Sequence, residues 1–246
     1  MAELDIVIPV YNEGRNIVAV LDALGEHVRT PFRVLICYDY EGDDTLPAVA
    51  SYHPVGFGIT LIKNRGQGVF GAITTGFADS RAPAVLMLPA DDDYNAPRLD
   101  AMVERMRSGC ELVVASRFIP GGCMDGSPLL KAALIRISAF ALRHFARLPT
   151  SDPSNGFRLF SRRLIESVPL ESTKGFTYSL ELLVKCHRLG WPIGEVPVEW
   201  HERKTGKSRF QILSWLPEYL RWFRYAFATT WLRRPPESVA RRGSPT

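Results

Sequence analysis

Short apolar runs alternate with stretches of helical periodicity over the first half of the chain. The runs are apolar throughout, which is typical of strands buried on both faces of a parallel sheet. We expect such strands over residues 4–10, 32–38, 58–63, 84–89 and 111–116. Between them the pattern predicts helices over residues 13–28, 67–80 and 97–108, the first capped by Asn12 and the third carrying Pro97 in its first turn.

This alternation predicts a doubly wound α/β fold, with a mostly parallel sheet flanked by helices. In such sheets, ligands bind beyond the carboxyl ends of the strands, near the point where the strand order reverses. Polar sequences follow four of the expected strands: PVYNE (9–13), YDYEGDD (38–44), PADDD (89–93) and ASRF (115–118). Strand ends are often polar loops for no functional reason, but the acidic bias occurs in three of these sequences and favours a ligand site.

The composition is that of an ordinary soluble protein. Of 246 residues, 46% are apolar and 23% are charged, and the formal net charge is +4. This basic excess suits an anionic ligand or lipid surface and is too weak and scattered to indicate nucleic acid. The four cysteines form no C-x-x-C pair, so we expect reduced thiols in the cytosol. Neither a signal peptide nor a membrane-spanning segment is predicted.

The sequence DDD at 91–93 is the clearest candidate for chemistry. In an extended turn, side chains two residues apart point to the same side, so Asp91 and Asp93 can converge while Asp92 turns away. Two carboxylates at one point suit a hard cation such as Mg²⁺ or Mn²⁺, which in turn binds phosphate oxygens of a nucleotide diphosphate. An acidic surface turn, or a cap for the helix that begins at Pro97, is the alternative interpretation.

Several motifs occur in a compatible order. IVIPVYNE opens the chain, Asp39 follows the second strand, and later come ASRFIPGG (115–122), SDPSNGFRLF (151–160), GFTYSLELL (175–183) and EVPVEWHERKTGKSRF (195–210). Together they resemble the family 2 glycosyltransferases of the GT-A fold, and among these the dolichyl- or polyprenyl-phosphate mannosyltransferases. The resemblance runs from about residue 4 to residue 210. It implies a GT-A fold, a nucleotide-sugar donor and a divalent metal ion.

The resemblance also implies roles for matching residues. Those expected to line the nucleotide and sugar are Pro9, Tyr11, Glu13, Asp39 and Ala90. Those expected to act on the metal and the phosphates are Asp91 and Asp93 as metal ligands, Arg117 facing the phosphates, and Arg203 and Arg209 closing over the donor from a mobile loop. Two positions depart from the family pattern. Pro89 replaces a common acid, so metal binding is expected to depend more on Asp93. Tyr38 replaces a frequent Asp, so the identity of the nucleotide base stays open.

A lipid-phosphate acceptor is largely a dianion at neutral pH, so transfer to it requires no catalytic base. Asp152 and Glu181 are the acids that could serve as one. For Asp152 we favour a structural role, orienting Arg158 or capping a turn, whereas Glu181 is either a pocket wall or an ion-pair partner. The cations considered for the acceptor phosphate are Arg117, Lys131 and Arg136, with a solvated helix face as the alternative for the last two.

Residues 214–234 interleave aromatic residues with arginines. Ser214 can cap a helix with Pro217 in its first turn, and one apolar stripe comprises Leu213, Leu216, Leu220, Phe223 and Phe227. Such a helix suits the membrane interface, with the helix over 127–147 as its partner. Packing on the catalytic domain or on a second subunit is the alternative.

We therefore expect a catalytic domain over residues 1–210, an amphipathic interface helix over 211–234 and a disordered tail over 235–246. The expected activity is inverting transfer of a sugar, foremost mannose from GDP-mannose, to a polyprenyl phosphate on the cytoplasmic, inner face of a membrane. A soluble or glycan acceptor with another nucleotide sugar, or a non-catalytic nucleotide-binding protein, is the alternative. Homo-oligomerisation stays open.

Overall fold

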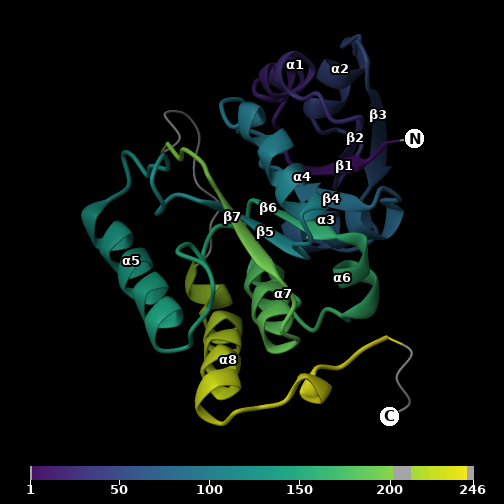
Figure 1. Ribbon diagram of the computed structural model, residues 1–246. Coiled ribbons are helices and arrows are strands. Elements are labelled where there is room, and N and C mark those ends of the chain that lie inside the picture. Colours follow the sequence, from purple (N-terminus) through teal and green to yellow (C-terminus); the bar gives the residue numbers. More distant parts are fainter. Residues whose placement is uncertain (1, 202–211, 243–246) are drawn as a thin grey trace.

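The computed structural model describes residues 2–201 and 212–242, and within them a seven-stranded sheet forms the centre of the molecule (Figure 1). The strand order is β3-β2-β1-β4-β6-β5-β7. The strands are β1 (Leu4–Val10), β2 (Phe32–Tyr38), β3 (Gly58–Lys63), β4 (Ala84–Met87), β5 (Leu112–Ser116), β6 (Arg158–Ser161) and β7 (Ile193–Pro197). Neighbours pair in parallel except at β6, which is antiparallel to β4 and to β5. The predicted mostly parallel α/β sheet is confirmed.

Two apolar clusters lie on opposite faces of this sheet. On one face the strands pack against α1 (Ile17–His27) and α4 (Leu99–Arg107), with α2 (Thr45–Ala50) beside α1. On the other face they pack against α3 (Gly68–Asp79), α6 (Arg162–Ser167) and α7 (Thr177–Arg188). The central strands are therefore buried on both sides, as their unbroken apolar runs predicted.

The two remaining long helices lie outside this sandwich, at the end of the sheet that carries β5 and β7 (Figure 1). Helix α8 (Ile212–Trp231) packs on α7, and α5 (Leu129–His144) contacts α8. Two short 3-10 helices, η1 (Ala96–Arg98) and η2 (Pro236–Ser238), complete the described elements. Pro97 lies in η1, directly before α4, as expected.

Two expectations about elements were wrong, and two strands were missed. Strand β3 is an edge strand with most of its residues exposed or half-buried, so its apolar run does not mark burial on both faces. Strands β6 and β7 were not predicted, because each has only four or five residues and its sequence contains no long apolar run. Helix α8 begins by Ile212, so Ser214 does not cap it and Pro217 lies in its interior.

Helix α8 divides its aromatic residues between the protein and the surface. Trp222 and Ala226 are buried, and the indole of Trp222 donates a hydrogen bond of 2.8 Å to the Ser172 hydroxyl. Leu216 and Leu220, two members of the apolar stripe expected from the sequence, are exposed. Part of this helix is therefore packed on the rest of the chain, chiefly on α7. Among the helices of the described residues, none combines the length and apolarity needed to cross a bilayer.

Candidate functional site

The strand order reverses between β1 and β4. From β1 the chain passes through α1 to β2 on one side, and from β4 it passes through α4 to β5 on the other. The two strands are parallel neighbours, with Leu4 opposite Ala84 and Val7 opposite Met87. At such a reversal a crevice opens beyond the carboxyl ends of the strands. Residues 11–13 and 91–93 follow those two ends, so the polar sequences singled out from the chain meet at the expected place.

Within the acidic turn, Asp92 is the buried member. Its carboxylate accepts hydrogen bonds from the backbone N–H of Asn95 (3.1 Å) and from the Asn95 side-chain amide (2.9 Å). Burial raises the pKa of Asp92 to about 7, and the negative charges of Asp91 and Asp93 add to the rise. Asp91 is half-buried and Asp93 exposed, so the turn holds Asp92 inward and concentrates negative charge beside it. This donor set fits a hard divalent cation; binding of such an ion by Asp91 and Asp93 stays a prediction.

Two exposed aromatic rings flank the end of β1. The centroids of Tyr11 and Tyr40 are 5.5 Å apart at an interplanar angle of 49°. The Tyr40 hydroxyl lies 2.5 Å from the side-chain oxygen of Asn12, while Asp39 accepts a hydrogen bond of 2.5 Å from the Asn64 amide. Tyr40 and Asn64 were not singled out from the sequence, although Tyr40 lies in the polar run after the second strand. These residues form a polar and aromatic surface beside the acidic turn.

Asn12 does not cap α1, contrary to the prediction. Its backbone is left-handed, with φ of 55°, and its N–H is 3.1 Å from both carboxylate oxygens of Asp43. The next two N–H groups donate to Thr45 Oγ1 (3.0 Å) and Asp44 Oδ1 (2.8 Å). Because these side chains occupy three successive N–H groups, residues 12–14 form a loop and α1 begins only at Ile17. Glu13 thereby stays at the site, where its carboxylate accepts a hydrogen bond of 2.7 Å from Asn16.

The two small residues predicted at the site are largely enclosed. Pro9 is half-buried in β1, opposite Cys37 of β2, and Ala90 is 4% exposed within the apolar cluster of the α1 face. Ala90 therefore fills a tight position at the start of the acidic turn. The contacts of Pro9 and Ala90 with a nucleotide sugar stay predictions.

Arg117 and Asp152 form a buried ion pair at the end of β5. Arg117 donates to the Asp152 carboxylate from Nε (2.7 Å), from Nη2 (2.8 Å) and from its backbone N–H (3.0 Å). Burial acts to raise the pKa of Asp152, but its bonds with Arg117 outweigh this effect and hold the pKa below its usual value. Asp152 therefore orients Arg117 and not Arg158, and the structural role favoured for it stays a prediction. The phosphate-facing role of Arg117 stays a prediction.

Glu181 is the partner of a buried lysine. It is fully buried, and its carboxylate accepts from Lys185 Nζ (2.6 Å) and from the backbone N–H groups of Glu171 (2.7 Å) and Ser172 (2.8 Å). The ion-pair alternative is thus observed. The fully buried Arg158 donates to the backbone carbonyls of Pro153 (2.5 Å) and Ser179.

A pocket of about 380 Å³ lies between the loop after β5 and helix α5. Arg136, Arg143, His144 and the rings of Phe118 and Phe140 are among its lining residues. The guanidinium of Arg136 lies 5.0 Å from the centroid of the Phe118 ring, and that of Arg117 lies 5.2 Å from it. Of the other predicted cations, Arg203, Arg209 and the side chain of Lys131 lie outside the described residues.

The sequence matches the family "Glycosyl transferase family 2" over residues 5–168. The chain belongs to glycosyl transferase family 2. The predicted resemblance is confirmed, and the protein is a glycosyltransferase with the GT-A architecture.

Curated relatives are similar over most of the chain. The polyprenol monophosphomannose synthase of Mycolicibacterium smegmatis is 24% identical over 83% of the chain and 79% of that protein. The undecaprenyl-phosphate mannosyltransferase of Micrococcus luteus is 26% identical over 82% of the chain and 85% of that protein. The dolichol-phosphate mannosyltransferase of Pyrococcus furiosus is 22% identical over 89% of the chain, which spans only 62% of that relative.

Solved structures share the fold. Glucosyl-3-phosphoglycerate synthase from Mycobacterium tuberculosis in complex with UDP has a TM-score of 0.65 at 18% identity, covering 92% of this chain and 80% of that one. The same synthase with Mn²⁺, UDP-glucose and phosphoglyceric acid has a TM-score of 0.65 at 19% identity, covering 93% and 79%. At these identities the likeness establishes the architecture.

Proposed function

We propose that the enzyme transfers mannose from GDP-mannose to a polyprenyl phosphate at a membrane surface, with Mg²⁺ or Mn²⁺ bound by Asp91 and Asp93. The main observation in favour of a lipid acceptor is the exposed apolar side of α5 next to a basic pocket. The names of the three relatives, which match 82% to 89% of the chain, support both a mannosyl donor and a lipid-phosphate acceptor.

On the donor side, the proposal uses the surface beyond the carboxyl ends of β1 and β4. The rings of Tyr11 and Tyr40 offer a surface for the base, and Asp39 and Glu13 offer carboxylates to the nucleoside hydroxyls. A divalent ion, when bound, offsets the charge that develops on the leaving diphosphate. Arg203 and Arg209 would add fixed positive charge to the diphosphate, since a guanidinium can contact two phosphate oxygens at once.

On the acceptor side, the proposal uses the pocket beneath α5. The pocket is lined by Arg136, Arg143 and His144. Arg117 lies next to it, because Arg117 and Arg136 both contact the ring of Phe118. Such a group of cations suits a phosphate monoester. That ester is mostly a dianion at neutral pH and attacks the donor sugar without a base. Asp152 and Glu181 are both held in buried ion pairs, which agrees with an attack that uses neither.

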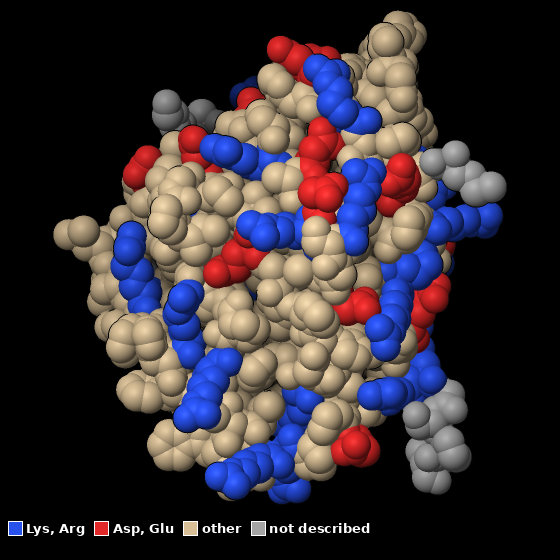
Figure 2. Space-filling view, in the orientation of Figure 1, with Lys and Arg blue, Asp and Glu red and all other residues tan. Residues whose placement is uncertain are grey.

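The membrane surface is proposed to be the side formed by α5 and α8. Large apolar side chains on α5 and just after it are 52% to 90% exposed, namely Leu129, Leu130, Leu134, Ile137, Phe140 and Phe145. The ends of the two helices are tied together, since Trp231 Nε1 donates to the carbonyl of Phe145 (2.9 Å) and Thr230 Oγ1 to that of Ala146 (2.6 Å). The charged side chains over this side are mainly Lys and Arg (Figure 2), which suits anionic lipid. Peripheral binding to the inner membrane face belongs to the same proposal.

The test is transfer of radiolabel from GDP-mannose to vesicles that contain a polyprenyl monophosphate, with Mn²⁺ or Mg²⁺ present. We expect a lipid-linked sugar that forms faster from GDP-mannose than from UDP-glucose. Labelling of phosphoglyceric acid or another soluble acceptor, with no labelled lipid, would overturn the lipid acceptor. Transfer to lipid from UDP-glucose alone would overturn the donor.

The membrane contact is tested by flotation of the protein with anionic vesicles. Substituting Leu130→Asp together with Ile137→Asp places charge on the exposed side of α5 and should abolish flotation without lowering thermal stability. Val55→Asp is the matched control, because Val55 is an 86% exposed apolar residue between α2 and β3, far from α5. Equal flotation of both variants and the wild-type protein would exclude α5 as the contact.

A further inference from the structure

A short parallel pairing beyond the ends of β5 and β7 brings three potential metal ligands together, with a further carboxylate beside them. The N–H of Cys123 donates to the carbonyl of Val198 (3.1 Å), and the N–H of Trp200 donates to the carbonyl of Cys123 (3.0 Å). The pairing continues to Asp125, which forms a bridge with His201. Residues two apart on an extended chain share a side. Cys123 and Asp125 therefore face the same way on one segment, as do Glu199 and His201 on the other.

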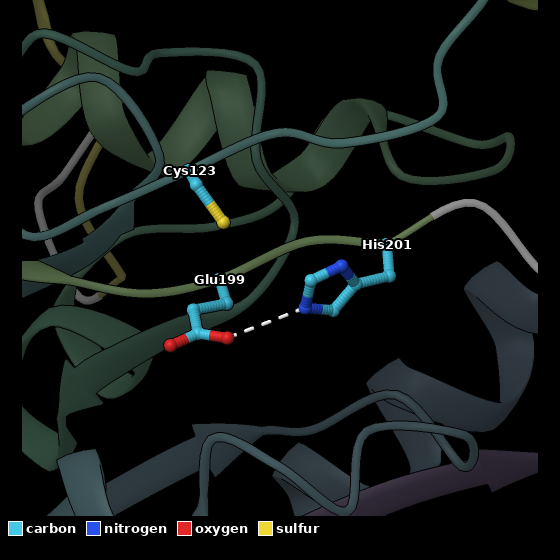
Figure 3. Close-up of side chains that lie close together, drawn as sticks. All are labelled: Cys123, Glu199 and His201. Carbon is cyan, nitrogen blue, oxygen red and sulfur yellow. Dashed lines mark hydrogen bonds and ion pairs between the residues drawn. The ribbon is translucent and has the colours of Figure 1, made fainter.

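The side chains meet on one side of this pairing. The Cys123 sulfur, a Glu199 carboxylate oxygen and an imidazole nitrogen of His201 all lie within 4.8 Å of one another (Figure 3). His201 Nε2 is 3.2 Å from Glu199 Oε2. Ligand atoms around a tetrahedral zinc ion are roughly 3.3–3.8 Å apart, given metal–ligand lengths of about 2.0–2.3 Å. Small side-chain rotations would bring the three atoms to that spacing.

The backbone and the imidazole of this cluster are held in place from outside it. The buried Asn95 side chain donates to the carbonyl of Glu199 (2.9 Å) and accepts from its N–H (3.0 Å). The ring of Tyr94 packs edge-on against the His201 imidazole, at 5.0 Å between centroids. The Asp125 carboxylate lies 3.7 Å from His201 Nδ1. A carboxylate that accepts from one imidazole nitrogen orients the ring and leaves the other nitrogen for a metal. A small rotation would bring Asp125, which also lies 3.6 Å from the Cys123 sulfur, into such a bond.

We propose that Cys123, Glu199 and His201 bind a thiophilic divalent cation of the zinc class, with Asp125 orienting the imidazole. Sulfur, nitrogen and carboxylate ligands together suit Zn²⁺, whereas Mg²⁺ prefers an all-oxygen set. This site shares no ligand with the proposed metal site of Asp91 and Asp93, and the proposal does not rest on the proposed function. The ion would fasten the loop after β5 to the segment after β7.

The test is titration of the full-length protein with Co²⁺, followed by the near-ultraviolet charge-transfer absorption of a cobalt–thiolate bond. A Co²⁺ ion at Asp91 and Asp93 gives no such band, so the signal reports sulfur coordination alone. We expect a saturable band that Zn²⁺ abolishes, and a rise in the thermal midpoint on addition of Zn²⁺. The variant His201→Ala should weaken Co²⁺ binding by at least about tenfold.

Matched variants separate this site from other sulfur and other metal ligands. Cys123→Ser should remove the band, while Cys110→Ser, at another partly buried free cysteine, should retain it. The double variant Asp91→Ala, Asp93→Ala should also retain it. Absence of the band in folded wild-type protein, its persistence in Cys123→Ser, or its loss in the double variant would each overturn the proposal.

Discussion

Replacing Asp152 by Ala should destabilise the enzyme strongly, because it leaves the guanidinium of Arg117 buried without its counter-ion. Asp152 is fully buried and Arg117 is 8% exposed. Two hydrogen bonds join the charged groups, and each such bond contributes about 1.5–3 kcal/mol. The sum, about 3–6 kcal/mol, agrees with the cost of about 3–5 kcal/mol for breaking a buried ion pair. We therefore expect the free energy of unfolding to fall by about 3–5 kcal/mol.

Urea unfolding at pH 7 measures this loss, and for a chain of this size the midpoint of thermal unfolding should fall by about 6–20 °C. The pKa of Asp152 is lowered in the folded protein. Its contribution is therefore present above the pKa of the unfolded chain, about 3.9, and is lost as the pH falls through the lower folded value. The difference between wild type and variant should accordingly narrow as the pH falls below about 4.

Two further variants test this account of the ion pair. Glu41→Ala breaks an exposed ion pair with Lys63 (2.8 Å) and should leave the free energy of unfolding unchanged. Replacing both charges, as Arg117→Met with Asp152→Leu, should recover most of the stability lost in Asp152→Ala, because no unpaired charge remains. A loss below about 1 kcal/mol in Asp152→Ala, or no recovery in the double variant, would refute this account of the pair.

Three other perturbations follow from the structure. Asp93→Ala should remove the thermal shift that Mn²⁺ and GDP together produce, without lowering the midpoint of the unliganded protein; a retained shift would exclude Asp93 as a metal ligand. Trp222→Ala should cost about 3–5 kcal/mol in urea unfolding, because this side chain is buried, whereas Trp231→Ala, at a residue 69% exposed, should cost far less. Gly76→Ala should lower the free energy of unfolding by about 1–3 kcal/mol, since the added Cβ would meet Val7 and Cys37. Gly58→Ala should lower it less, because a Cβ there meets no atom within 4 Å. Equal losses in the two variants would contradict the close contact of α3 with β1.

The sequence by itself determined the alternation of strands and helices and the meeting of its polar strand ends. Unbroken apolar runs such as residues 4–10 fold as central strands because both of their faces need apolar partners. The positions of residues 11–13 and 91–93 followed, since neighbouring parallel strands have their carboxyl ends at one edge. The motifs were also sufficient to predict the family.

Only the tertiary structure decided which polar groups pair and which apolar groups stay exposed. The N–H of Asn12 bonds to Asp43 at a separation of 31 residues, and Arg117 bonds to Asp152 across 35. Apolar periodicity reports on a single element and contains no information about such partners. The same limit applies to β3, whose apolar run lies at an exposed edge, and to α5, where Leu129, Leu130 and Leu134 are exposed but Leu142 is buried. The burial of a side chain and its hydrogen-bond partners depend on which other elements lie next to it. Those neighbours are determined only when the helices and strands pack together.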